Sequence, residues 1–357
     1  MKHFIIFGLL LFSILRVNSQ SNKTKFSDGL LKEIKYSKPF LSELHSTINK
    51  IEIGYHLDYG PYNLDDNFSY FNRPMVEIHL GFDAPLYSFN FGKLNNNQAK
   101  WGLGLSIPVS IHVLEDMWEP ITAAVIDVDY RFGSPRIRGI RYFDSNSFIN
   151  NISFSWLPIF HECTHLGDEL VLAMAAKDYP LKRVNVSYEY TELQITLNDA
   201  DGSNETNHSF RLGGRYRISN RGYGWFGTES FAVDSTIVNF EQSTHRFEYN
   251  IEYQLQRSHG FLAGKRIMNF FSIDISSRVK LGIPVFHKVD NKWVEKDKVE
   301  KNVLTINTYF GWKFFAKNKT THPLGLYFHL YRGINNWGQL RNQGNYGFVG
   351  IALTYQP

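Results

Sequence analysis

The stretch Lys50-Ile51-Glu52-Ile53-Gly54-Tyr55-His56-Leu57-Asp58 alternates polar and apolar residues at almost every step. Successive side chains of a β-strand point to opposite faces, so this alternation predicts a strand with one wet face and one apolar face. The pattern recurs along the chain, at Val76–Phe82, Trp101–Leu105, Val184–Tyr190, Phe247–Tyr253, Phe271–Ile275 and Tyr346–Tyr355. The sequence therefore predicts an all-β protein from residue 49 to residue 357.

The length of these segments and the aromatic content indicate a membrane environment. The chain holds 29 Phe, 20 Tyr and 7 Trp, together 16% of its residues. Many segments have about ten residues, the length that a tilted strand needs to cross a bilayer. Twelve or thirteen segments can be counted, and closed bacterial barrels have even strand numbers. We predict a closed antiparallel transmembrane β-barrel of about twelve strands at 49–357, with a soluble β-sandwich as the alternative.

The first residues have the features of an export signal. A basic start, Met1-Lys2-His3, precedes an apolar run from Phe4 to Leu15, which is too short to span a bilayer as a helix. Val17-Asn18-Ser19 then offers small or medium residues to a signal peptidase. We predict a signal peptide at 1–19, a short N-terminal periplasmic segment at 20–48, and localisation in the cell outer membrane.

Charge and cysteine content narrow the classes of partner. The net charge of +4 is small and spread along the chain, and no nucleic-acid-binding motif is present, so no nucleic-acid partner is expected. Cys163 is the only cysteine, so no disulfide framework is expected. The expected partners are outer-membrane lipids and, during biogenesis, the barrel-assembly machinery. We expect no cofactor and no resident metal, and we expect polar stretches such as Val289–Asn302 to form outward loops.

One cluster could carry chemistry: Phe160-His161-Glu162-Cys163-Thr164-His165-Leu166-Gly167-Asp168-Glu169. Two His flanking a Glu match a zinc-hydrolase signature, which requires a helix, because only there do residues four apart share one face and one metal. On a strand the two Cα atoms would be about 13 Å apart. Helix-favouring residues follow the cluster, so both local structures are open, and a zinc-dependent hydrolase is one alternative function.

A hydrolase triad is a second interpretation of the same cluster. His161 or His165 could act as the base toward Thr164 or Cys163, with Asp168 or Glu169 orienting the imidazole. We therefore take His161, Thr164, His165, Asp168 and Glu169 as candidate catalytic residues. The structural alternative is a hydrogen-bonded polar cluster that closes one end of the barrel.

Several motifs resemble a bacterial family of outer-membrane barrels of unknown function, whose central motif reads approximately His-x-Ser-Ser-His-Leu-Gly-Asp-Glu. The matching residues are Thr164–Glu169, Asn185–Glu189, Leu330–Gly333, Trp337–Gln339 and Tyr346–Ile351. The resemblance covers roughly residue 75 to the end and implies a barrel of this size without implying an activity. This chain has Cys163-Thr164 where the family has Ser-Ser, which puts a serine nucleophile in doubt.

Two functions follow from these observations. The first is a structural or transport role, in which charged and amide side chains of the alternating strands line a polar lumen. The second is an outer-membrane lipid hydrolase, such as a lipid A or phospholipid deacylase, with its site at His161–Glu169. The sequence does not choose between them.

Overall fold

The structure is a computed structural model. It describes residues 48–58, 73–93, 99–117, 124–143, 149–166, 186–199, 206–218, 247–262, 265–289, 292–315, 324–334 and 346–355. The signal peptide and almost all of the N-terminal segment predicted from the sequence lie outside this part. Among the described residues, no helix is long and apolar enough to cross a membrane.

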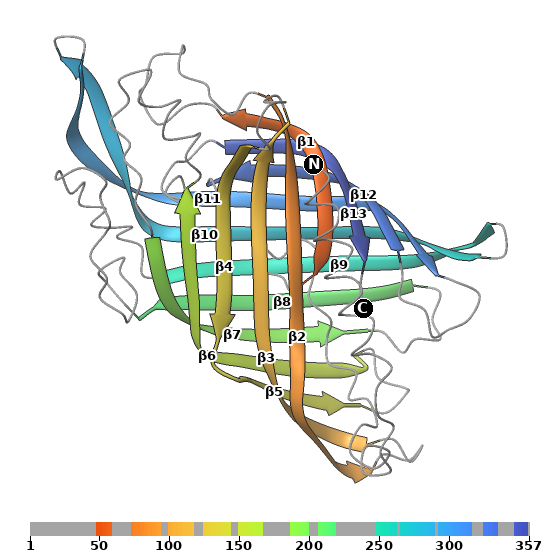
Figure 1. Cartoon of the computed structure of the whole chain (residues 1–357). Coiled ribbons are helices and arrows are strands. Elements are labelled where there is room, and N and C mark those ends of the chain that lie inside the picture. Colours follow the sequence, from red (N-terminus) through yellow and green to blue (C-terminus); the bar gives the residue numbers. More distant parts are fainter. Residues whose placement is uncertain are drawn as a thin grey trace.

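In the described part of the chain, thirteen strands form one antiparallel sheet (Figure 1). Their bounds are β1 Asn49–Asp58, β2 Arg73–Lys93, β3 Ala99–Asp116, β4 Ala124–Gly133, β5 Arg136–Tyr142, β6 Asn151–Leu166, β7 Val186–Asn198, β8 Thr206–Arg217, β9 Phe247–Leu262, β10 Lys265–Val289, β11 Lys292–Phe315, β12 Leu324–Gly333 and β13 Tyr346–Tyr355. The sheet closes on itself, because β1 pairs with both β2 and β13, and β2 pairs with β3.

The ring has twelve strand positions although it has thirteen strands. Both β4 and β5 lie between β3 and β6: β4 pairs with β3 at Val109–Asp116, and β5 pairs with it at Trp101–Ser106. They are two halves of one position, interrupted at Ser134-Pro135. The prediction of a closed antiparallel barrel of about twelve strands is confirmed.

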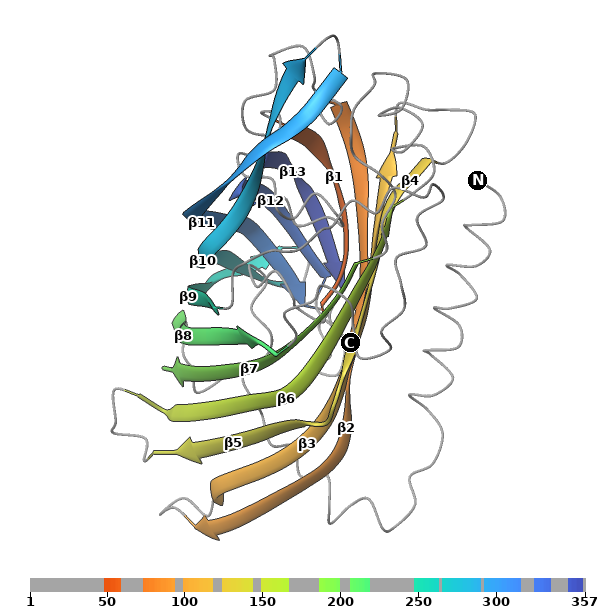
Figure 2. The same ribbon diagram turned by 90° about the vertical axis from the view of Figure 1, so that its left-hand side faces the viewer.

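Prolines mark a bend that crosses four neighbouring strand positions. Pro85 and Pro108 lie on β2 and β3, Pro135 separates β4 from β5, and Pro158 lies on β6. The β2–β3 register shifts just after Pro85, and the β6–β7 register shifts across Pro158. Proline cannot donate to a ladder, and bulges bend strands, which accounts for the curvature of β2, β3 and β6 in Figure 2.

The polarity of the two barrel faces is the reverse of that in a soluble protein. On β1, Lys50 and Glu52 point inward and are buried, whereas Ile51 and Ile53 point outward and are 44% and 52% exposed. The same holds on β12, where exposed apolar residues alternate with buried ones that include His329. A continuous outward apolar surface is stable in lipid, and a closed strand ring satisfies its backbone hydrogen bonds there. The outer face is therefore the lipid-facing one.

Connection lengths distinguish the two ends of the barrel. At the end where β1 begins, the connections are short, as at residues 94–98 and 263–264. At the other end the longest connections are found, as at residues 167–185 and 218–246, and the short one between β10 and β11 joins two long strands. Outer-membrane barrels have short periplasmic turns and longer external loops, so we assign the end where β1 begins to the periplasm.

The longest hairpin, formed by β10 and β11, extends beyond its neighbours on the external side. The two strands pair with each other as far as Val289↔Lys292, whereas pairing with β9 ends at Val279 and pairing with β12 ends at Ile306 (Figure 1). The sequence placed an outward loop at Val289–Asn302. The segment is outward, but it is a strand ribbon rather than a loop.

A charge on the outer face tests the lipid-facing assignment. Ile351, midway along β13, is 49% exposed, so Ile351→Arg would place a cation near the middle of the bilayer. We expect a loss of about 2–4 kcal/mol in the free energy of unfolding from lipid vesicles, measured by denaturant titration. The control, Tyr355→Arg at the strand end, should lose about 0–1 kcal/mol. Equal losses would contradict the assignment.

Candidate functional site

Ion pairs link the inner side chains of many strands. Asp83 of β2 accepts hydrogen bonds from Arg136, at 3.0 Å, and from Arg138, both on β5. The guanidinium of Arg136 also lies 3.8 Å from the carboxylate of Glu192 on β7. These contacts skip over β3 and β6, so they run through the lumen rather than along one hairpin.

The same line of charges continues around the wall. Arg215 of β8 donates to Glu192 at 2.6 Å and to Glu248 of β9 at 2.7 Å, and Arg278 of β10 donates to Glu248 at 2.8 Å. We call this series the arginine chain; its members are Arg138, Asp83, Arg136, Glu192, Arg215, Glu248 and Arg278. Charged hydrogen bonds of this kind stabilise buried ions that would otherwise be costly.

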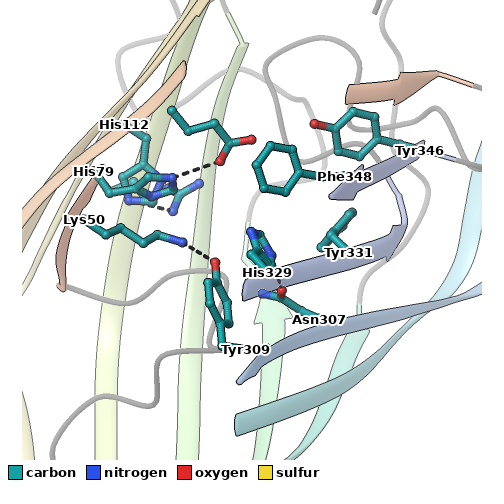
Figure 3. A pocket seen from close by; sticks show the side chains of 11 residues that line it. Lys50, His79, His112, Asn307, Tyr309, His329, Tyr331, Tyr346 and Phe348 are labelled. Atoms are coloured by element: carbon teal, nitrogen blue, oxygen red, sulfur yellow. Dashed lines mark hydrogen bonds and ion pairs between the residues drawn. The ribbon is translucent and has the colours of Figure 1, made fainter. Parts of the chain in front are cut away.

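A second network surrounds a small cavity in the lumen, which we call the lumen pocket (Figure 3). It lies among strands from both ends of the chain, β1–β4 and β11–β13. Its lining side chains are Lys50, Glu77, His79, His112, Arg131, Asn307, Tyr309, His329, Tyr331, Tyr346 and Phe348. Strands distant in sequence meet here because the barrel closes between β1 and β13.

Glu52 organises one side of the lumen pocket. Its carboxylate accepts hydrogen bonds from the Tyr309 hydroxyl, at 2.7 Å, and lies 2.5 Å from Lys50 Nζ. Its other oxygen is 2.6 Å from His329 Nδ1, and His329 Nε2 is 2.6 Å from the side-chain oxygen of Asn307. The Tyr309 and His329 rings stack with centroids 4.0 Å apart. Both ring nitrogens of His329 are thus engaged.

Histidines crowd the other side of the lumen pocket. Glu77 lies between His56, at 3.3 Å, and His79, at 3.2 Å. The rings of His79 and His112 have centroids 4.0 Å apart, and His112 Nε2 is 3.3 Å from Arg131 Nη1. Arg131 also contacts two carboxylates, Asp129 at 3.1 Å and Glu162. Arg131 therefore joins the histidines to acidic groups on β4 and β6.

These inner side chains are shielded from water. Glu52 and Asp129 have 0% of their surface exposed, and Arg131 has 3%. Glu252 and Ser272, on the opposite wall, are also at 0%. Side chains that line an open aqueous channel would be hydrated, so the described part of the lumen is filled rather than open.

Three of the five residues proposed from the sequence as catalytic are described, and they lie on a strand, not a helix. His161, Thr164 and His165 belong to β6, and the backbone pairing with β4 and β7 is continuous across positions 161–164. The helical geometry that the zinc interpretation requires is therefore absent here, and that interpretation is wrong. Among the described residues, no group of three or more His, Cys, Asp or Glu is placed to hold a metal.

His161 lies on the outer face, in a row whose members on β2, β3 and β4 are apolar. The register connects Phe82 with Val109, Val109 with Phe132, Phe132 with His161, and His161 with Glu189. Phe82 and Phe132 are 49% and 46% exposed, but the His161 side chain is only 13% exposed. His161 Nδ1 lies 3.4 Å from a carboxylate oxygen of Glu189, and its ring packs on Phe132.

The structure describes only part of the cluster that the sequence proposed as catalytic. Position 164 pairs with Asp129, whose side chain faces the lumen, whereas position 161 pairs with the outward-facing Phe132. Positions 161 and 164 therefore belong to different rows of the sheet. Position 165 is placed by its backbone alone, and Asp168 and Glu169 lie outside the described residues. The carboxylate that meets His161 is Glu189 of β7, a residue that sequence reasoning did not select.

Sequence reasoning also missed the lumen pocket. Its charged residues were visible as the polar half of alternating segments, including Glu52 and His56 on one strand and Glu77 and His79 on the next. The partners that make them a cluster are far away along the chain: Glu52 and Tyr309 are separated by 257 residues. Only the closure of the barrel supplies these contacts.

Comparisons with known proteins return likenesses of fold. No family model matches the sequence, and no curated protein matches it. Outer membrane phospholipase A from Escherichia coli is 10% identical, over 87% of this chain and 93% of that chain, with a TM-score of 0.38. LpxR from Salmonella typhimurium is 8% identical, over 86% of this chain and 99% of that chain, with a TM-score of 0.34. The transport unit of the autotransporter AIDA-I from Escherichia coli is 10% identical, over 87% of this chain and 88% of that chain, with a TM-score of 0.36.

These identities and TM-scores carry nothing about activity, so the class of the protein follows from its own geometry. A closed twelve-position antiparallel ring with a polar, ion-paired interior and an apolar outer face is an outer-membrane β-barrel. This fold confirms the predicted localisation in the outer membrane. The resemblance to a barrel family with a Ser-Ser-His-Leu-Gly-Asp-Glu-like motif stays a prediction.

The arginine chain makes a sharp prediction about stability. Arg215→Met would remove the buried guanidinium that joins Glu192 to Glu248, so we expect a loss of about 3–5 kcal/mol in the free energy of unfolding. Arg141→Met is the control, because Arg141 is exposed and packs over Trp101 on the outer face. Denaturant titration should show little change there, and a similar loss in both variants would contradict the role of the chain.

Proposed function

We propose that this protein is a structural outer-membrane barrel whose lumen is occluded at neutral pH, so that it does not act as an open pore. The observation that carries the proposal is the burial of ion-paired side chains throughout the described lumen, with Glu52, Asp129 and Glu252 fully shielded. A diffusion channel needs water along its axis. Here charged side chains take the place of that water.

Two networks support the occlusion from different walls. The arginine chain spans β2, β5 and β7–β10, and the lumen pocket joins β1–β4 to β11–β13. Moving an ion-paired side chain of either network aside would break a buried ion pair, which costs several kcal/mol. The closed arrangement is therefore favoured over an open lumen with the same fold.

Conductance across planar bilayers tests the structural proposal. Purified wild-type protein should show no steady channel current near neutral pH. Replacing Glu192, Arg215 and Glu248 together by Ala removes the central ion pairs of the arginine chain, including the contacts that Arg136 and Arg278 make with the two carboxylates, and this variant should conduct. Steady porin-like current from the wild type would remove the proposal.

A second candidate, a lipid-directed hydrolase, is favoured by the His161–Glu189 pair. A histidine and a carboxylate within 3.4 Å are unusual in an apolar row of the lipid-facing surface, because polar groups there are costly unless they are paired and used. The pair lies toward the external ends of β6 and β7 and is largely buried, with the His161 side chain 13% and that of Glu189 6% exposed. The lipids nearest to it would be those of the outer leaflet.

The chemistry of the pair suits ester hydrolysis. Glu189 lies on the Nδ1 side of His161 and would fix the tautomer, leaving Nε2 to take a proton. The nucleophile would be a water, or the Cys163 thiol on the same strand face, and it would give its proton to Nε2 as it attacks an ester carbonyl of a lipid. His161 would then return the proton to the departing alcohol of the lipid. If the thiol is the nucleophile, water hydrolyses the resulting thioester. Either route gives a fatty acid and a lipid alcohol.

Lipid analysis tests the hydrolase candidate. Cells that express the wild type should contain deacylated lipid A or lysophospholipid, and His161→Asn and Glu189→Gln should each reduce this product by roughly 10²-fold or more. The control is His208→Asn, which changes an exposed histidine bonded to Tyr253. Mass spectra that are identical with wild type, with His161→Asn and without the protein would remove this candidate.

A further inference from the structure

An arginine on the lipid-facing surface is held between aromatic rings. Arg141 of β5 is exposed; its register partner on β3 is Trp101, whose own partner on β2 is Phe91. The guanidinium carbon of Arg141 lies 5.0 Å from the centroid of the Trp101 ring and 5.0 Å from that of the Phe143 ring. Two rings therefore contact one guanidinium, in the part of the wall where β2, β3 and β5 lie side by side (Figure 2).

The aromatic contacts continue away from Arg141 across the outer face. Phe91 and Trp101 stack with centroids 6.3 Å apart and planes 8° apart, and Phe89 stacks with Phe91 at 5.7 Å. All three side chains are exposed. Outer-membrane barrels carry such aromatic residues where the hydrocarbon meets the headgroups. The stack therefore places Arg141 near the depth of a headgroup layer.

The strand ends agree with that depth and identify the leaflet. Arg141 is the residue before the last one of β5, Tyr142, and Trp101 comes two residues after the start of β3 at Ala99. The connection at residues 94–98, which joins β2 to β3 at this end, is one of the short connections that mark the periplasmic side. The headgroups nearest to Arg141 are therefore those of the periplasmic leaflet.

Arg141 brings a positive charge to an apolar part of the outer face. The register connects it with apolar residues on both sides, namely Phe91, Trp101, Ile152, Leu197 and Phe210. Within the part of the chain that the structure describes, no carboxylate pairs with Arg141. A charge beside hydrocarbon is costly unless an opposite charge is near. An anion supplied by the membrane would lower that cost.

The arrangement of the guanidinium favours a phosphate as this anion. Rings that pack over a guanidinium leave free its N–H bonds, which lie in its plane. Two of these parallel N–H bonds match two oxygens of one phosphate. A lipid headgroup with a net negative charge offers this phosphate alone, whereas a zwitterionic headgroup adds an ammonium that repels the guanidinium. The site therefore favours an anionic phospholipid over a zwitterionic one.

We propose that Arg141, held by Trp101 and Phe143, binds the phosphate of an anionic phospholipid in the periplasmic leaflet. The site is separate from the lumen and from the His161–Glu189 pair, which lies toward the external ends of its strands, so it depends on neither candidate function. Phe89 and Phe91 lie on the hydrocarbon side of the site and would pack against the acyl chains. An exposed ion pair adds little to folding stability, so the site should be visible in lipid binding rather than in unfolding.

Competition between two lipids tests the site. The full purified protein in detergent is incubated with equal amounts of dioleoyl phosphatidylglycerol and dioleoyl phosphatidylethanolamine, separated from free lipid by gel filtration, and analysed for retained lipid by mass spectrometry. The wild type should retain phosphatidylglycerol in roughly threefold excess or more. Equal retention overturns the proposal. A large excess of inorganic phosphate should leave the preference unchanged; if it removes the preference, the site takes free phosphate and the lipid assignment is overturned.

Variants separate this site from a general effect of positive charge. Arg141→Met should abolish the preference, and Arg141→Lys should lose most of it, because an ammonium lacks the planar pair of donors. Two controls should keep the preference: Arg257→Met, which changes an exposed arginine of β9, and Asp144→Asn, which removes the carboxylate that follows Phe143 in the sequence. Heat-modifiable gel mobility checks that each variant is folded. A preference that survives in either Arg141 variant, or that disappears in either control, overturns the proposal.

Discussion

The constraint on which the rest of the structure depends is that a bilayer offers no water to unpaired backbone groups. A sheet in lipid must therefore have no free edge, and the pairing of β1 with β13, from Asn49↔Tyr355 to Asp58↔Tyr346, removes the last one. Once the ring is closed, alternation sends every second side chain into a confined interior. That interior is filled by charges, and their pairing follows from their confinement.

The sequence predicted what depends on local pattern and missed what depends on register. The alternation at Lys50–Asp58 and Tyr346–Tyr355 identified strands, and parity gave twelve positions. The pairing of His161 with Glu189 depends on a bulge at Leu157–Phe160, which shifts the β6–β7 register and is not visible in any periodicity. Asp168 and Glu169, the acidic partners expected nearby in sequence, lie outside the described residues and stay a prediction.

A single strand serves both sites. Glu162 of β6 reaches Arg131 inside the barrel, and its neighbour His161 meets Glu189 outside it. Adjacent residues of a strand point to opposite faces, so a shift of β6 that releases Arg131 would also move His161 relative to β7. The bulge and Pro158 lie directly before this segment and set where it sits.

The split position of β4 and β5 has a consequence for how the chain is threaded. Thirteen strands that each reversed direction would leave β1 starting and β13 ending on opposite sides of the membrane, and those two could not lie antiparallel. Because β4 and β5 run the same way, direction reverses an odd number of times from β1 to β13. The interruption at Ser134-Pro135 thus adds a strand while β1 and β13 keep their antiparallel hydrogen bonds. An odd number of strands is therefore compatible with an even number of positions in the ring.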